Sequence, residues 1–344
     1  MTVVVTGANG HVGANLVREL LRRGRAVRAV IHRHQHALEG LDIERVPGDV
    51  RDPASLRRAF RGAEVLYHLA AVISIDGDRD GVVRATNVDG VRNVAAAALE
   101  CGVRRMVHVS SVHAFVQEPL DEALDEGRAR VTSPRYPAYD RSKAAGEAEV
   151  RQVVARGLDA VIVNPTGIIG PHDYAPSRMG RVFLDLYHRR LPALVAGGFN
   201  WVDVRDVVAG AIAAETRGRT AENYLLSGHW QSLRALASMA EQVTGVRAPL
   251  LTCPMGLARV AAPVVTVAGR IVGTEPLFTR ESLHALRANR RVPHDRATRE
   301  LGYEPRPTRD SVTAVYEWFA RTGRVALRGE VRSAPDATAR PARG

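Results

Sequence analysis

Short apolar runs alternate with longer amphipathic segments through the first half of the chain. The runs that predict buried strands lie at residues 2–6, 26–31, 43–46, 64–69, 105–109 and 160–163. The segments that predict amphipathic helices lie between them, at 14–23, 53–60, 82–101 and 138–156. Apolar strands separated by helices are typical of a parallel sheet that is buried on both faces. We therefore predict an α/β fold.

The pattern loosens after Asn164, where prolines and loops become frequent. One more strand and helix are expected between residues 201 and 226, and helices with connections over 233–321. A turn-rich connector at 303–308 precedes a last predicted helix at 311–322. This change of pattern predicts a second, smaller lobe.

Three glycines follow the first predicted strand directly, in the sequence Gly7-x-x-Gly10-x-x-Gly13. In this context Gly7 permits a tight turn, Gly10 lets the backbone approach a pyrophosphate, and Gly13 lets helix and strand pack closely. The N-terminus of the next helix offers free N–H groups to the phosphates. We therefore predict a dinucleotide site on a Rossmann-type, doubly wound sheet; the alternative is a structural turn without a ligand.

The predicted organisation follows from this site. Residues 1–165 form the dinucleotide-binding domain, which the segment 201–226 completes. Residues 166–322 form a mostly helical substrate-binding lobe, and 324–344 a disordered tail.

The second predicted strand ends at His32-Arg33-His34, where an acid would hold the ribose 2′-hydroxyl of NAD. Arg33 can instead pair with a 2′-phosphate. This favours NADP(H) over NAD(H). The alternative is that Arg33 is one more surface arginine of an arginine-rich chain.

Lys143 is the only lysine among 48 basic residues, and it follows Tyr139 by four positions. Arginine replaces lysine easily where only charge is needed, but poorly where a compact, titratable ammonium must sit beside a hydroxyl. On a helix, positions 139 and 143 share a face. We therefore interpret the pair as catalytic; the alternative is that the single lysine is incidental.

Composition excludes several classes of protein. The two cysteines, Cys101 and Cys253, provide neither a disulfide framework nor a metal-ligand spacing, which suits a reducing cytoplasm. The chain starts directly with the first strand, so no signal peptide and a cytoplasmic location are expected. The apolar stretch 255–273 contains two arginines and a proline, which argues against firm membrane insertion. Loose attachment to a membrane surface, or an apolar substrate, stays open.

The net charge of +11 raises the possibility of a nucleic-acid partner. However, the arginines are spread along the chain, with no basic run that could follow a phosphate backbone. The tail alone holds five arginines against two acids. We expect no nucleic-acid partner.

The glycine loop, a serine after a strand and the Tyr-x-x-x-Lys spacing together resemble the extended short-chain dehydrogenase/reductase family. Within it, the chain looks most similar to dihydroflavonol-4-reductase-like and 3β-hydroxysteroid-dehydrogenase-like members. Further segments that agree are Gly48-Asp49-Val50, His68-Leu69-Ala70-Ala71, Asn87-Val88-Asp89-Gly90 with Asn93, Asn164-Pro165-Thr166, Gly170-Pro171 and 201–207. The resemblance covers residues 1 to about 320.

The resemblance implies the site residues. The catalytic residues would be Ser111, Tyr139 and Lys143. Tyr139 would be the general acid/base, and the Lys143 ammonium would lower the pKa of Tyr139. Ser111 would form a hydrogen bond with the substrate oxygen. By itself Ser111 could equally be a turn residue. The implied cofactor contacts are Gly7, Asn9, Gly10, His11, Val12, Gly13, Arg33, Asp49, Val50, Leu69, Ala70, Ala71, Ser110, Tyr139, Lys143, Pro165, Thr166, Gly167 and Ile168. Candidate substrate contacts are His113, Asp173 and Arg178, for which structural or surface roles are the alternative.

These residues predict an NAD(P)(H)-dependent oxidoreductase that acts on a fairly apolar carbonyl or secondary alcohol. One alternative is an NAD-dependent sugar-nucleotide epimerase, which uses the same Ser-Tyr-Lys set. A second is a non-catalytic cofactor-sensing protein, against which the intact set argues. A dehydratase is disfavoured because residues 111–113 lack an acidic pair. A homodimer through the Tyr139 helix is implied by the resemblance alone.

Overall fold

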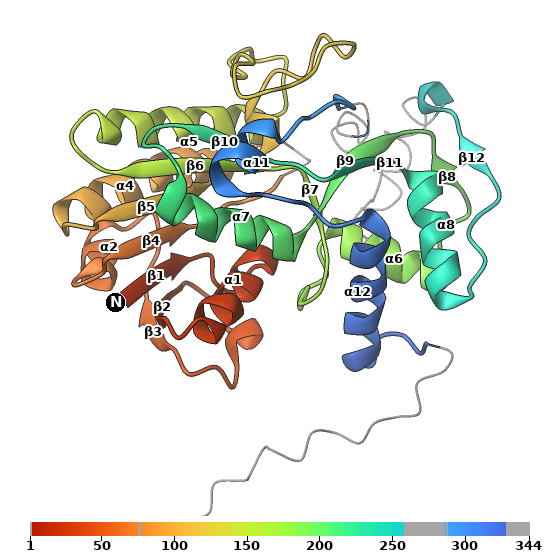
Figure 1. The fold of residues 1–344 in the computed structure, drawn as a ribbon, viewed down its shortest axis with the longest axis horizontal. Coiled ribbons are helices and arrows are strands. Elements are labelled where there is room, and N and C mark those ends of the chain that lie inside the picture. Colours follow the sequence, from red (N-terminus) through yellow and green to blue (C-terminus); the bar gives the residue numbers. More distant parts are fainter. Residues whose placement is uncertain (1, 75–76, 258–285, 287, 328–344) are drawn as a thin grey trace, which may run out of the picture.

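The computed structural model describes residues 2–74, 77–257, 286 and 288–327. Its centre is a parallel seven-stranded sheet with the order β10-β6-β5-β4-β1-β2-β3 (Figure 1). The strands are β1 (Thr2–Thr6), β2 (Ala26–Ile31), β3 (Glu44–Pro47), β4 (Val65–His68), β5 (Arg105–Val109), β6 (Ala160–Pro165) and β10 (Asn223–Leu226). This is the doubly wound order of a Rossmann-type fold, so the predicted fold class is confirmed.

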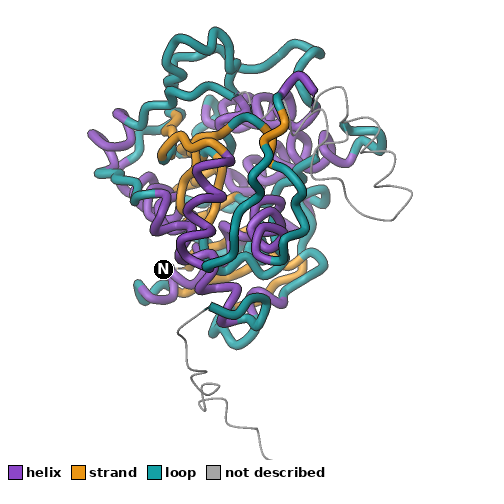
Figure 2. Tube along the Cα trace, turned by 90° about the vertical axis from the view of Figure 1, so that its right-hand side faces the viewer, coloured by secondary structure: helices purple, strands orange, loops and turns teal. Residues whose placement is uncertain are grey.

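Helices cover both faces of the sheet, as Figures 1 and 2 show. One face packs against α1 (His11–Arg22), α7 (Val204–Arg217) and α11 (Asp295–Leu301), and the other against α2 (Pro53–Phe60), α4 (Gly90–Glu100) and α5 (Ala138–Val154). In β1, Val3 and Val5 point into the first core and Val4 into the second. Because successive strand side chains alternate between faces, a strand buried on both faces has an uninterrupted apolar sequence.

The predicted helix at 82–101 is present but irregular. It starts as α3 (Val82–Arg84), passes through a π-helical turn (Ala85–Asp89) and continues as α4. Asn87, inside the π-turn, is buried, and its amide nitrogen donates to the Val72 carbonyl oxygen and to Ser142 Oγ, each at 2.9 Å. The π-turn therefore ties this helix to α5, which carries Tyr139 and Lys143.

The second lobe combines helices with two small sheets that the sequence pattern did not predict. Its elements are β7 (Gly167–Ile169), α6 (Arg178–Tyr187), β8 (Leu194–Val195), β9 (Gly198–Asp203), β11 (His229–Ser232), α8 (Leu233–Thr244), β12 (Thr252–Cys253) and α12 (Thr308–Arg321), with the sheets β11-β9-β7 and β12-β8. Phe183, Trp201, Leu236 and Phe319 lie in its core. β7, β8 and β12 have only two or three residues, too few for a periodicity to be recognised from the sequence, whereas β9 overlaps the strand expected from residue 201 onward.

The first four residues of the predicted tail belong to the described part of the chain. Residues 324–327 pack on the second lobe, where Arg324 donates to the Tyr174 carbonyl oxygen at 2.8 Å and Val325 is buried. Residues 328–344 lie outside the described part of the chain, and so does the apolar stretch 255–273 from residue 258 onward. Among the described helices, none combines the length and apolarity needed to cross a membrane. The described residues also contain no group of three potential metal ligands.

Candidate active site

The glycine loop lies where the strand order reverses, between β1 and β4. The two strand ends are joined there by the backbone N–H of Leu69, which donates to the Thr6 carbonyl oxygen at 3.2 Å. A Cβ added to Gly7, whose φ is +69°, would lie 2.6 Å from the Ala70 nitrogen, and one added to Gly13 would lie 2.2 Å from the Gly7 oxygen. Only glycines fit these positions, and this loop geometry fits a dinucleotide pyrophosphate at the start of α1.

Side chains of the loop bond to the protein itself. Asn9 Oδ1 accepts the Ala37 N–H at 2.9 Å, and His11 Nε2 lies 3.0 Å from the Pro171 carbonyl oxygen. Val12 packs partly buried against the core beneath α1. For a bound phosphate, the loop therefore offers backbone N–H groups rather than these side chains.

The predicted adenosine end lies at the ends of β2 and β3. Arg33 is exposed directly after β2. Asp49 accepts hydrogen bonds from Arg51, which hold its pKa near 2, and lies 3.2 Å from His32 Nε2. Val50 is buried, and its carbonyl oxygen accepts a hydrogen bond from Asn93.

The three predicted catalytic residues lie together at the end of β5. Ser111 follows the strand, and its Oγ accepts the His113 N–H at 3.2 Å. Tyr139 and Lys143 are one turn apart on α5, and Lys143 Nζ donates to the Val109 carbonyl oxygen at 3.0 Å. The N-terminal half of α5 therefore sits directly over the strand end that carries Ser111.

Burial raises the pKa of Tyr139 to about 12, while a hydrogen bond from Ser111 and the charge of Arg178 act in the opposite direction. The sequence led us to expect that Lys143 lowers this pKa. Instead, the Lys143 ammonium is bonded to backbone, and its own pKa is lowered to about 8 by burial, with Glu147 opposing the shift. At neutral pH Tyr139 therefore carries its proton and Lys143 is mostly cationic.

Two buried histidines lie on neighbouring strands beside this lysine. His68 and His108 stack with their ring centroids 5.3 Å apart. Burial lowers the pKa of His68 to about 3 and that of His108 well below its usual value, and the charge of Lys143 adds to both shifts. Both rings are therefore neutral at physiological pH.

The remaining predicted cofactor residues surround the strand ends. Leu69 and Ala70 are partly exposed after β4, and Ala71 is exposed. Ser110 is buried, and its hydroxyl has no hydrogen-bond partner among the described residues, so it can bond a ligand.

The segment from Pro165 to Ile168 lies where β6 passes into β7. The Thr166 hydroxyl and Asn200 Oδ1 are 3.0 Å apart, and a Cβ on Gly167 would lie 2.6 Å from the Phe199 ring. These side-chain contacts hold the junction between the large sheet and the second lobe.

Two of the three candidate substrate residues lie beside Tyr139. The His113 ring stacks on Phe199 at 5.6 Å and meets the Tyr139 ring edge-on at 6.0 Å. Arg178, the first residue of α6, is near enough for its charge to act on Tyr139.

Asp173, the third candidate, bonds to the backbone at the start of α6. Its buried carboxylate accepts the Ser177 N–H at 2.9 and 2.8 Å and so holds the turn before α6.

Sequence reasoning missed Glu147, a fully buried carboxylate one turn beyond Lys143. The available signal was its spacing of four residues from the only lysine on the same helix. Phe199, the platform for His113, carried no local signal because it comes from a short strand of the second lobe.

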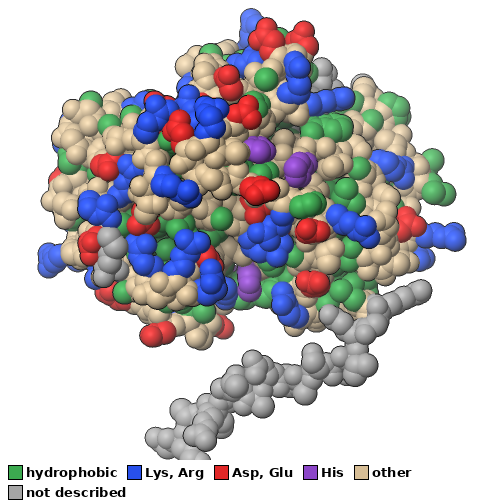
Figure 3. Space-filling view, in the orientation of Figure 1, with side chains coloured by type: hydrophobic (Ala, Val, Ile, Leu, Met, Phe, Trp, Pro, Cys, Tyr) green, Lys and Arg blue, Asp and Glu red, His purple; other side chains and the backbone are tan. Residues whose placement is uncertain are grey.

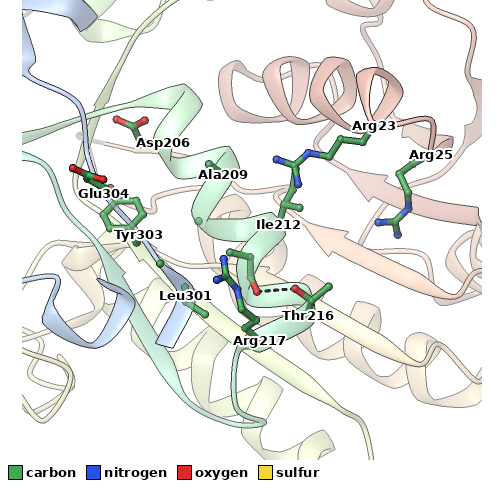
Figure 4. A pocket seen from close by; sticks show the side chains of 13 residues that line it. Arg23, Arg25, Asp206, Ala209, Ile212, Thr216, Arg217, Leu301, Tyr303 and Glu304 are labelled. Carbon is green, nitrogen blue, oxygen red and sulfur yellow. Dashed lines mark hydrogen bonds between the residues drawn. The ribbon is translucent and has the colours of Figure 1, made fainter. Parts of the chain in front are cut away.

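A separate hollow of about 400 Å³ lies between the end of α1, α7 and residues 301–304 (Figure 4). It contains none of the predicted site residues. Two of its arginines, Arg23 and Arg25, form ion pairs with Glu19 and Glu215. On the face that Figure 3 shows, basic and acidic side chains are interspersed rather than gathered by sign.

The fold and the site define a Rossmann-type protein with a dinucleotide loop and a Ser-Tyr-Lys set. The chain belongs to the NAD dependent epimerase/dehydratase family, whose model matches residues 3–226. It is 40% identical over 332 residues to sterol demethylase protein B of Methylococcus capsulatus, covering 94% of this chain and 100% of the relative. It is 30% identical over 324 residues to 4-hydroxy-2-methyl-3-oxo-4-farnesyl-3,4-dihydroquinoline-1-oxide ketoreductase of Stigmatella aurantiaca, covering 90% and 93%.

Among solved structures, the crystal structure of gox2253 is similar with a TM-score of 0.82 and 35% identity, covering 94% of this chain and 99% of that one. Relatives whose names refer to dihydroflavonol 4-reductase and to 3β-hydroxysteroid dehydrogenase/decarboxylase match as well. The resemblance seen in the sequence is therefore confirmed. The chain is an enzyme, an oxidoreductase of this family.

Proposed function

We propose that this oxidoreductase uses NADP(H) to interconvert a ketone and a secondary alcohol on a fairly apolar molecule, with Ser111, Tyr139 and Lys143 as catalytic residues. The observation that carries the proposal is the meeting of these three residues at the end of β5, beside the strand ends that carry the glycine loop. The names of the relatives support the substrate class, since they refer to a sterol, a farnesylated quinoline and a steroid.

The high pKa of Tyr139 means that its hydroxyl starts in the protonated form, which suits a proton donor to a carbonyl oxygen. A phenol with a pKa of about 12 carries its proton at neutral pH and can donate it to the substrate oxygen as negative charge develops there. The Ser111 hydroxyl can bond the same oxygen and so orient the carbonyl. The nicotinamide supplies the hydride when it is bound.

The cofactor residues fit this cofactor class. The backbone of residues 7–13 would hold the pyrophosphate, Arg33 the 2′-phosphate, and Lys143 the nicotinamide ribose. The exposed position of Arg33 at the end of β2 supports the choice of NADP(H).

A cytoplasmic location and a homodimer complete the proposal. The dimer would form through the outer face of α5, where Ala138, Ala145, Ala148 and Ala155 line a shallow groove of about 840 Å³. The same groove is also lined by Arg84, Arg130, Arg141 and Arg151, so a partner helix would meet cationic as well as small side chains.

An NAD-dependent sugar-nucleotide epimerase is the second candidate. The family name and the similar fold of a nucleoside-diphosphate-sugar epimerase from Pseudomonas aeruginosa, with 25% identity and a TM-score of 0.76, favour it. It predicts tightly held NAD that survives purification. The reductase predicts an empty site that takes up added NADPH.

The test begins with mass spectrometry of any nucleotide in the purified protein. Fluorescence titrations with NADPH and NADH and a screen of apolar ketones for NADPH oxidation follow. Tyr139→Phe is expected to lower kcat at least a hundredfold with NADPH affinity retained, because the proton donor is lost. Tyr187→Phe, at the far end of α6, is the matched control. Unchanged turnover in Tyr139→Phe would remove Tyr139 from the mechanism.

A further inference from the structure

Glu147 is a carboxylate with 0% exposure, buried one helical turn from Lys143. Its Oε2 accepts hydrogen bonds from Arg130 Nε at 2.9 Å and Asn223 Nδ2 at 3.1 Å. Its Oε1 accepts one from Asn164 Nδ2 at 2.6 Å. An unpaired buried carboxylate is strongly disfavoured, so this set of donors shows how the fold retains the negative charge.

The same hydrogen-bond network reaches the serine loop. Asn164 Nδ2 also donates to the Ser111 carbonyl oxygen at 2.9 Å, and Asn164 Oδ1 accepts from Asn223 Nδ2 at 2.7 Å. Glu147 therefore fixes the orientation of the Asn164 amide, and through it the backbone at Ser111. One carboxylate is thus connected to two of the three predicted catalytic residues.

Two buried carboxylates on α5, Asp140 and Glu147, lie within about one helical turn of Lys143, and Asp140 acts on Tyr139. On α5, Glu147 is the acidic neighbour that favours the ammonium, and Tyr139 is protonated at neutral pH. His68 on β4 and His108 on β5 are neutral there. Burial disfavours the charged form of Lys143, and the negative charge of Glu147 favours it. Glu147 therefore opposes the loss of the proton from Lys143.

We infer that Glu147 is a positioning residue, which keeps Lys143 in its cationic form and holds the Ser111 backbone through Asn164. Two arginines weaken the effect of Glu147 on the Lys143 ammonium. Arg130 and Arg151 both form ion pairs with Glu147 Oε2 and so partly neutralise its charge. Glu147 does not touch the reacting atoms. The inference rests on the proposed function, in which Lys143 acts as an ammonium.

The single lysine makes a direct test feasible. Protein labelled with ¹³Cε-lysine has one lysine Cε resonance, whose chemical shift reports the protonation of Lys143 across a pH titration. This readout needs neither substrate nor cofactor. In wild-type protein the midpoint is expected near pH 8, since the pKa of Lys143 is lowered to about 8 by burial.

Two substitutions in one ion pair should move this midpoint in opposite directions. Glu147→Gln removes the negative charge and should lower the midpoint by roughly half a pH unit or more. Arg151→Gln removes a cation that partly neutralises Glu147 and should raise it. Glu147→Asp keeps the charge and should restore most of the wild-type value. If Glu147 had only a structural role, Glu147→Gln and Arg151→Gln would both lower stability. The Lys143 titration midpoint would then not move in opposite directions in the two variants.

An unmoved midpoint in a folded Glu147→Gln protein, or a fall in Arg151→Gln, would overturn the inference. If Glu147→Gln does not fold, the partly exposed Arg151 still provides the test. The proposed function is tested separately in wild-type protein, by NADPH binding and ketone reduction. A wild-type protein that neither binds NADPH nor reduces ketones would contradict the proposed function, whatever the titration of Lys143 shows.

Discussion

The glycine loop allows packing and ligand binding to be separated by two substitutions. In Gly13→Ala, the new Cβ would lie 2.2 Å from the Gly7 oxygen and 2.7 and 2.8 Å from the Cα and carbonyl carbon of Ala8. All three atoms are backbone, so none can rotate away. Overpacking of this kind costs about 1–3 kcal/mol, which for a chain of this size lowers Tm by several degrees.

Gly10→Ala should behave differently. Its Cβ would meet only the Gly7 oxygen, at 3.3 Å, which a small adjustment relieves. The free energy of unfolding should therefore change by less than about 1 kcal/mol. However, the methyl group would occupy the place where the backbone approaches the pyrophosphate. We expect NADPH affinity to fall at least tenfold, about 1.4 kcal/mol.

Differential scanning fluorimetry and NADPH fluorescence titration measure the two effects separately. Gly256→Ala is the control, because a Cβ there meets no atom of the described residues within 4 Å. It should change neither Tm nor affinity. If Gly10→Ala binds NADPH as tightly as the wild type, the loop is not the pyrophosphate site. If Gly13→Ala is as stable as the wild type, the packing argument is wrong.

Three further predictions concern single side chains. Arg33→Ser should weaken NADPH binding at least tenfold and leave NADH binding unchanged; equal effects on both cofactors in titrations would contradict a 2′-phosphate contact. Lys143→Met should abolish turnover yet raise the urea unfolding free energy at pH 7 by about 3 kcal/mol, because folding lowers the lysine pKa from 10.5 to about 8 and so disfavours the charged form. This gain should shrink as the pH rises from 8 towards 10.5, where the wild-type folded lysine is already neutral; a gain independent of pH would refute it. Asp173→Ala should lower stability by about 1 kcal/mol with KM retained, since the carboxylate binds the Ser177 N–H; a raised KM at unchanged stability would return Asp173 to the substrate site.

The sequence determined the parallel sheet, the glycine loop and the spacing of the proposed catalytic residues. Strands such as 2–6 lie inside the sheet and are buried on both faces, so their central positions are apolar on either face. Such a continuous apolar run can be recognised from the sequence alone. Gly13 is required by backbone contacts within one strand–turn–helix unit, and Gly7 is required by the positive φ of the turn. Tyr139 and Lys143 are placed by a single helical turn, so their spacing alone predicts that they share a face.

Tertiary structure decided what depends on contacts between distant segments. The small sheets of the second lobe pair strands of two to six residues, and residues 324–327 bond to Tyr174 and Tyr187, which lie far away in sequence. The high pKa of Tyr139 and the low pKa of Lys143 come from burial, which no local pattern encodes. The donors around Glu147 come from residues 130, 164 and 223, which meet only when β6, β10 and α5 pack together. Local spacing could place the catalytic side chains, but their protonation depends on desolvation and charge, and these are properties of the assembled fold.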